Sequence, residues 1–441
     1  MKRIFKFIAV LLLLTAKWLS VASQPLPLDS CIRYTLEHNK ALLARTKNRT
    51  IESYKRKTKQ LALYPDVQFT SGVDYYWKIP VQMFPAEIIG GQAGSFIPIR
   101  LGLPYTGNYG ITADANLVDV EKWQRVKLAL LQEKLANASV QSYARELIKN
   151  VKLSYYQVLL LQRSVALSDS LYRNYVQINT LIQQKYDEGI ADKITVNQSA
   201  NILSERLDRL IKEKTQLQVA FLNLKVWMGY PFDKALSISE ENTHIPGYAH
   251  FEENRLPALE VEQLKVENAY RLMKAASNSW YPRLKLQAGY TKTGYSEQLG
   301  FAPGFDWFPS GYLGLKLQFT LSAFYRMGAQ VQEHKAAWEQ SKIHYQLYVE
   351  QAQKDFYEQK ALAAQYGAIL HNNEKAIERA RESERLTLQK LQDNIIDMTQ
   401  IKQASDDLYR LQELYNTNRL NYISAAIQME YLQHKNSSNE Q

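Results

Sequence analysis

The sequence has little cysteine, glycine or proline. Its 441 residues include one cysteine, Cys31, which excludes an internal disulfide framework, a CxxC redox pair and a thiolate zinc cage. Glycine (18) and proline (13) are few and clustered, and this scarcity of helix breakers predicts long uninterrupted helices. The mean hydropathy of −0.38 excludes a polytopic helical membrane protein. These absences predict a mainly helical protein without a disulfide or zinc scaffold.

The N-terminus reads as an export signal. Residues 1–23 carry four basic residues and no acid, contain an apolar run from Phe7 to Ala16, and end in small residues. Ten apolar residues fall short of the roughly 20 that span a bilayer, so the segment is interpreted as a secretory signal peptide. Without it, the formal charge of +10 falls to about +6, with no dense basic clusters, which excludes a nucleic-acid partner. Residues 28–31 are a poor lipobox, and Cys31 is interpreted as a small buried helix residue.

The same order of elements occurs in both halves of the chain. A stretch without Gly or Pro, a Tyr-Pro pair, an alternating strand, a Gly/Pro-rich loop, a second strand and a long helix follow one another twice. A period of about 200 residues is too long for a solenoid unit and indicates duplication of one large module. The predicted segments are 1–23 signal peptide, 24–64 helix, 65–118 β-hairpin around loop 77–108, 119–228 helical hairpin, 229–256 irregular segment, 257–281 helix, 282–321 β-hairpin, 322–433 helical hairpin and 434–441 polar tail.

Four stretches alternate polar and apolar residues with the period of a β-strand. They start near Asp66, Tyr109, Arg283 and Tyr312, and each has about nine or ten alternating residues, the length of a transmembrane barrel strand. A water-soluble sheet with one buried face has the same pattern and remains the alternative. An open four-stranded sheet leaves edges that a membrane does not tolerate, and bacterial barrels need about eight strands or more. A barrel would therefore require strands from several copies of the chain. The candidate lumen-facing residues are Gln68, Asp74, Asp114, Asn116, Lys285, Gln287, Lys316 and Gln318.

The helical stretches are far longer than those of a globular domain. Residues 119–187 alone would form a helix of roughly 100 Å. Apolar residues recur every seven positions at Val151, Val158, Val165 and Tyr172, and on the adjacent row at Leu161, Tyr175 and Ile182. This spacing predicts a left-handed coiled-coil seam.

Several motifs in this order resemble the TolC-like outer membrane efflux protein family. Residues 26–39 (LPLDSCIRYTLEHN) resemble the family's opening motif LxLxxCIxxALxxN, and residues 186–200 resemble its hairpin-tip motif. The pairs Tyr64-Pro65 and Tyr281-Pro282, with residues 319–328 (FTLSAFYRMG), resemble its strand boundaries. No single motif is specific, but their order and spacing across nearly the whole chain after the signal are.

The resemblance implies a fold and a function. Three chains would share a 12-stranded barrel in the outer membrane of a Gram-negative bacterium, with a large periplasmic tunnel of helices. Such a homotrimer passively exports substrates received from an inner-membrane transporter through a periplasmic adaptor protein, and it opens at the tip by an iris-like loosening of its helical hairpins. The alternative is a secreted coiled-coil structural or adhesion protein without channel activity.

The hairpin tips are the predicted gate and adaptor contact. The resemblance places the gate on the returning helix of the second repeat, where Gln400 and Gln403 stand in place of the family's acidic residues. Asp393 and Asp397 lie within about a turn and are read either as substitutes or as solvated helix ends. Gly189 and Asp192 mark the first tip, and Asn394 stands where the second tip usually has glycine.

The sequence contains no pattern that indicates catalysis. The seven histidines are scattered, no HExxH or Cys/His cluster occurs, and the glycine-rich stretch 90–94 is not followed by GK[ST]. We therefore expect no enzyme activity, no cofactor and no resident metal. The loop 77–108, which carries several apolar residues, is a hypothetical cover of the barrel mouth.

Overall fold

The structure is a computed structural model that describes residues 25–239, 250–299, 305–392 and 398–433. The predicted signal peptide and polar tail lie outside these residues. The chain divides into two compact units. We call residues 49–135 and 264–343 the sheet unit, and the described parts of 1–48, 136–263 and 344–441 the helical unit. The longest helices, α4 (Val120–Asp187) and α7 (Ala323–Gln392), contribute to both units.

The expected mainly helical fold is confirmed. Beside α4 and α7, the helices are α2 (Leu28–His38), α3 (Lys40–Leu61), α5 (Lys193–Met228), α6 (Leu259–Ser277) and α8 (Met398–Gln433). Except for α7, which contains Gly328 and Gly367, their limits follow the stretches that lack glycine and proline, because nothing in those stretches interrupts the backbone hydrogen-bond ladder. In both halves, one or two helices, two strands of ten or more residues, a long helix and a 36-residue helix follow in this order, with two shorter strands inserted in the first half. No helix within the described ranges is both long and apolar enough to cross a bilayer.

The expectation of one continuous N-terminal helix is wrong, because α2 and α3 are separate helices. It breaks at Asn39, whose backbone is extended (φ −65°, ψ 118°). The Asn39 side-chain oxygen accepts the amide of Leu42, while its Nδ2 donates to the carbonyl of Trp227 at 2.8 Å. Gly229 ends α5 in the left-handed region, and a Cβ there would lie 2.7 Å from the carbonyl oxygen of His38. The break therefore depends on the close packing of α2 against the end of α5.

Four antiparallel strands form the sheet unit's main sheet. They are β1 (Asp66–Tyr75), β4 (Tyr105–Val118), β5 (Arg283–Ser296) and β6 (Asp306–Gln318), in the order β1-β4-β5-β6. The expectation of nine or ten residues is wrong for the last three, which have 14, 14 and 13 residues. Pairing continues into the stretches read as loops, where Tyr105 still opposes Ser296. The loop 77–108 also contains its own hairpin, β2 (Val81–Pro85) and β3 (Phe96–Arg100), joined through a short 3-10 helix, Ala86–Ile89.

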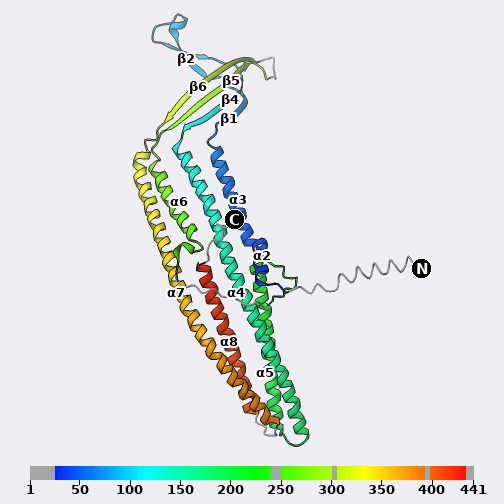
Figure 1. Ribbon diagram of the computed structural model, residues 1–441. Coiled ribbons are helices and arrows are strands. Elements are labelled where there is room, and N and C mark those ends of the chain that lie inside the picture. Colours follow the sequence, from blue (N-terminus) through cyan, green and yellow to red (C-terminus); the bar gives the residue numbers. More distant parts are fainter. Residues whose placement is uncertain (1–24, 240–249, 300–304, 393–397, 434–441) are drawn as a thin grey trace, which may run out of the picture. The chain divides into compact units, whose positions relative to one another are not determined.

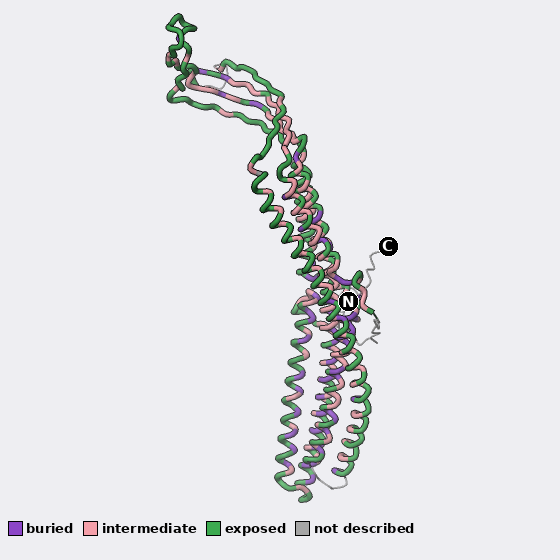
Figure 2. Tube along the Cα trace, turned by 90° about the vertical axis from the view of Figure 1, so that its left-hand side faces the viewer, coloured by how far each residue is buried: buried purple, intermediate pink, exposed green. Residues whose placement is uncertain are grey.

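The core lies in the helical unit. Figure 1 shows α4, α5, α7 and α8 side by side, and Figure 2 shows the buried residues concentrated on such helices while the strands are mostly exposed or intermediate. Along α4 the buried side chains follow steps of four and three residues through Ser164, Ser168, Leu171, Tyr175, Ile178, Ile182 and Lys185. This is the heptad spacing expected of a coiled-coil seam. Val151 and Val158 are buried as predicted, whereas Leu161, Val165 and Tyr172 are half-buried neighbours of the seam.

A second cluster holds the irregular segment against the helices. Cys31 is completely buried there, as the sequence indicates, together with Val158, Leu224 and Met228. The Tyr155 hydroxyl, at the same place, donates to the carbonyl of Ser239 at 2.5 Å. The N-terminal end of α2 and the start of the 229–256 segment therefore share one packed core with α4 and α5.

Candidate functional site

The eight candidate lumen residues lie on one face of the main sheet. Asp114 opposes Asp66 on β1 and Gln287 on β5, and Lys285 opposes Asn116 and Lys316. Side chains alternate between faces along a strand, so this register places all the predicted residues on a single face, which we call the polar face. Gln287 Nε2 donates to Asp114 Oδ1 at 2.7 Å across two strands. A polar recess of about 530 Å³ opens at the helix end of this face, beside Asp66, Asp119 and Lys122.

The opposite face of the sheet is apolar and uncovered. Ile111 in the middle of β4 is 54% exposed, and Leu313 on β6 is 75% exposed. The other members of this apolar face are Val67, Phe69, Val73, Leu117, Tyr290, Leu315 and Leu317, all exposed. A monomeric soluble protein rarely leaves so large a contiguous apolar surface in water. In addition, neither β1 nor β6 has a partner on its outer edge among the described strands.

Aromatic side chains gather at both ends of the strands. Near the helices these are Tyr64, Trp280, Tyr281, Phe319, Phe324 and Tyr325, all exposed. At the other end Tyr75 and Trp307 lie on the apolar face and Trp77 follows β1, whereas Tyr295 and Phe308 lie on the polar face, and all five are exposed. Aromatic rings at both ends of an apolar band are typical of a surface that crosses a membrane.

The predicted first tip is a tight turn between α4 and α5. Gly189 has φ 77°, in the left-handed region that favours glycine. Asp192 caps α5, because its Oδ1 accepts the amide of Thr195 at 2.7 Å, and this hydrogen bond holds the pKa of Asp192 below its usual value. On the neighbouring helix α8, Gln400 and Gln403 are exposed. Asp393, Asn394 and Asp397 lie outside the described residues.

Behind the tips, polar side chains join α8 to the first helical hairpin. Arg206 on α5 is 1% exposed, and its Nη2 lies 2.7 Å from Asp406 Oδ1 on α8. Its guanidinium also covers the ring of Tyr175 on α4 at 4.9 Å. Two turns further along, the Tyr409 hydroxyl donates to Glu213 and accepts from Ser168 at 3.1 Å. We call Ser168, Arg206, Glu213, Asp406 and Tyr409 the interhelical polar cluster.

Burial sets the electrostatics of this cluster. It raises the pKa of Glu213, although hydrogen bonds from Tyr409 and Ser168 and the charge of Arg209 act in the opposite direction. The pKa of Tyr409 is raised as well, chiefly by burial, so the phenol stays protonated and able to donate. A further buried cation, Lys185 on α4, donates to the carbonyl of Leu391 at 2.7 Å, near the C-terminal end of α7 where a positive charge is favourable.

Sequence reasoning missed this cluster. Arg206 and Lys185 look like ordinary solvated helix residues, and no short motif surrounds them. The available signal was periodicity: Lys185 continues the heptad rows of α4, and Arg206 lies four residues from Ile202 and Leu210, which are buried on the same side of α5. In the described part of the chain, no three His, Cys, Asp or Glu side chains are grouped so as to hold a metal ion.

Comparison with known proteins shows which family this chain resembles. Residues 31–230 match the model of the outer membrane efflux protein family. The resemblance to TolC-like channels is confirmed. "Toxin and drug export protein A" from Aggregatibacter actinomycetemcomitans is 22% identical over 224 residues, which are 49% of this chain and 48% of that protein. The chain spans less than half the length of the curated relatives that it matches.

The fold of outer membrane channels extends over more than nine-tenths of the chain. The structure of the Campylobacter jejuni CmeC outer membrane channel has a TM-score of 0.74 at 11% identity and covers 93% of this chain and 88% of its own. That of the Vibrio cholerae outer membrane protein VceC has a TM-score of 0.72 at 14% identity and covers 92% and 95%. At such low identity the likeness concerns the fold. The family match in sequence includes α2, the first two strands of the main sheet and the first tip.

Proposed function

We propose that the chain is one third of an outer-membrane export duct. Three copies pair the β6 edge of one chain with the β1 edge of the next and close a 12-stranded barrel, and their helices form a periplasmic tunnel. Substrate passes through passively after an inner-membrane transporter and a periplasmic adaptor deliver it. The two halves of the chain, with helices of 68 and 70 residues and of 36 and 36 residues, support an origin by duplication.

One observation carries the proposal: a four-stranded sheet with an uncovered apolar face and two open edges. In water such a face and such edges favour aggregation, and in a bilayer the unpaired backbone groups of an open edge are intolerable. Closure with further copies satisfies the edges and places the apolar face against lipid. Two chains supply eight strands and three supply twelve, and the likeness to outer membrane efflux channels favours three.

The dimensions of the strands agree with a bilayer. A strand of ten residues such as β1 is about 33 Å long, and a tilt of about 45° reduces its height to about 23 Å. The apolar band of outer-membrane barrels is about 25 Å tall. The longer strands β4, β5 and β6 then extend beyond the band with their aromatic ends, and the β2–β3 hairpin lies on the outer side.

The polar face becomes the barrel lumen in this arrangement. Of the predicted lumen residues, the acids Asp74 and Asp114 lie on β1 and β4, whereas the bases Lys285 and Lys316 lie on β5 and β6. Each copy therefore brings both signs of charge to the lumen, with Asp306 at the far end of β6 as a further acid on this face. We assign the first tip, with Gly189 and Asp192, to the periplasm, where the adaptor would bind.

Two neighbouring residues of β4 provide the test. We expect Ile111→Arg, on the apolar face, to disfavour insertion by about 2–4 kcal/mol, the effect of a basic residue at the bilayer midplane. Thr112→Arg, on the polar face, is the matched control and should assemble normally. The assay is detergent extraction of the outer membrane, followed by mass determination of unheated and heated protein.

The wild-type chain and Thr112→Arg should give a heat-dissociated species of three chains, and Ile111→Arg should give little or none. Equal behaviour of the two variants would contradict a lipid-facing apolar surface. A wild-type monomer released without detergent would favour the alternative, a secreted coiled-coil structural or adhesion protein.

A further inference from the structure

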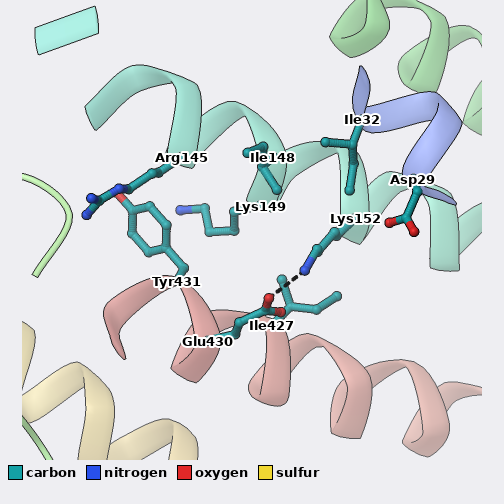
Figure 3. Close-up of a pocket in the computed structure, with 9 residues that line it drawn as sticks. All are labelled: Asp29, Ile32, Arg145, Ile148, Lys149, Lys152, Ile427, Glu430 and Tyr431. Carbon is teal, nitrogen blue, oxygen red and sulfur yellow. Dashed lines mark hydrogen bonds and ion pairs between the residues drawn. The ribbon is translucent and has the colours of Figure 1, made fainter. Parts of the chain in front are cut away.

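A cleft in the helical unit gathers positive charge without a matching number of acids. It has a volume of about 210 Å³ and lies between α2, α4 and α8 (Figure 3). Arg145, Lys149 and Lys152 enter it from α4, where their spacing of four and three residues puts them on one helix face. Isoleucines from α2, α4 and α8 form the apolar part of the lining.

Only one of the three cations has a carboxylate partner. Lys152 Nζ pairs with Glu430 Oε1 on α8 at 2.6 Å. Lys149 instead places its ammonium 4.2 Å from the ring centroid of Tyr431, and neither it nor Arg145 forms an ion pair with another described residue. The second acid of the lining, Asp29, is exposed at one end of the cleft. The cleft thus holds one cation in an ion pair and two, Arg145 and Lys149, that lack one within the described residues and are here called uncompensated.

Both uncompensated cations are half-buried. Burial lowers the pKa of Lys149, against the weaker opposite effect of Glu146, and burial also lowers the pKa of Arg145, against the weaker opposite effects of Tyr431, Glu260 and Tyr348. Two half-buried like charges about one helical turn apart destabilise the cleft in two ways, because each loses hydration and the two repel each other. An anion between them would remove both penalties and leave the apolar lining for the rest of the ligand.

We propose that this cleft binds a small amphipathic monoanion, a carboxylate or sulfonate carried on one ring or a short chain. The anionic group lies between Arg145 and Lys149, and the apolar part lies against Tyr431 and the isoleucines. The volume is below the roughly 300–1,000 Å³ of pockets for drug-sized ligands, which limits the occupant to a small molecule. Because the cleft lies within one chain and one unit, such binding does not depend on the chain forming a duct.

The test uses the full-length protein in an uncharged detergent and para-trifluoromethylbenzoate as the probe, followed by fluorine NMR. The neutral para-trifluoromethylbenzamide has the same shape and reports binding without charge. Lys149→Met keeps the aliphatic stem and removes the charge, and it should weaken benzoate binding about tenfold. Lys214→Met makes the same change at an exposed residue of α5 outside the cleft and should leave binding unchanged.

Glu430→Gln provides a change of opposite sign. It releases Lys152 from its ion pair and adds a third uncompensated cation, so benzoate binding should become tighter. A thermal melt of each variant, followed by circular dichroism of its helices, shows that the fold is intact. Equal binding of benzoate and benzamide, equal affinity of all variants, or no saturable benzoate binding would overturn the proposal, and a channel that conducts normally in those cases would leave the proposed function standing.

Discussion

Removal of Asp406 should loosen α8 from the first helical hairpin. In the native structure Arg206 is 1% exposed, and Asp406, whose side chain is 36% exposed, is its only carboxylate partner in the described part of the chain. Asp406→Asn leaves a buried guanidinium without its ion-pair partner, with only the weaker attraction of Glu205, and loss of such a partner costs about 3–5 kcal/mol when both partners are fully buried. Since water reaches Asp406, we expect a smaller loss of about 2 kcal/mol, which corresponds to about a 30-fold increase in local opening.

Hydrogen exchange of the assembled protein measures this opening. Amides of α5 and α8 near the pair should exchange about 30-fold faster in Asp406→Asn. The double variant Arg206→Met with Asp406→Asn should recover most of the lost stability, because neither replacement leaves an unpaired charge in the buried site. Arg410→Met, which breaks the exposed pair of Arg410 with Asp407 on α8 (3.4 Å), is the control and should change opening by less than about 1 kcal/mol.

The reasoning fails if Asp406→Asn exchanges like the wild type. It fails equally if the double variant is as loose as the single one, because the effect would then come from lost packing and not from an uncompensated charge.

Three further predictions concern the same unit. Burial raises the pKa of Glu213 above its usual 4.5, so the folded protein binds this proton more tightly than the unfolded chain does, and the stabilisation from protonated Glu213 is fully present below pH 4.5 and is lost as pH rises through the raised pKa. Opening of α5 from α8 should therefore increase with pH, and Glu213→Gln should remove that dependence in hydrogen exchange. Asn39→Ala should lower the thermal stability by about 1–2 kcal/mol, because it removes the cap of α3 and the bond to Trp227, whereas an unchanged melting temperature would show that the break in the helix is intrinsic. Gly229→Ala should cost more than about 1 kcal/mol in the same melts, because of the positive φ and the nearby carbonyl of His38; an equal stability would refute the close approach.

The elements of this fold could be predicted because each has a strong local signal. Long stretches without glycine or proline predicted the limits of α4, α5 and α8 to within a few residues, and α7 follows the alternating strand in the same way although it contains Gly328 and Gly367. Strict alternation gave the four strands of the main sheet and the shared face of residues such as Asp114 and Lys285, which stands as a prediction of the lumen.

What escaped prediction depends on contacts between distant segments. The break at Asn39 exists because Trp227 and Gly229, almost 190 residues away in sequence, meet it. The strands extend past the alternating stretches because cross-strand pairing, and not side-chain alternation, determines where they end. Arg206 is buried because α8 lies over it, and a helical sequence alone does not show which of its polar residues a distant helix will cover.

The open edges of the main sheet have a consequence for how the protein is made. If β1 and β6 find their partners only on other copies, a newly exported chain is not stable as a monomer, and its lifetime depends on how soon it associates with other copies. Until then its uncovered apolar strands are substrates for periplasmic chaperones and proteases. The cellular amount of assembled protein should therefore fall more steeply than the rate of synthesis when expression is reduced, because pairing of the open strand edges depends on the concentration of chains.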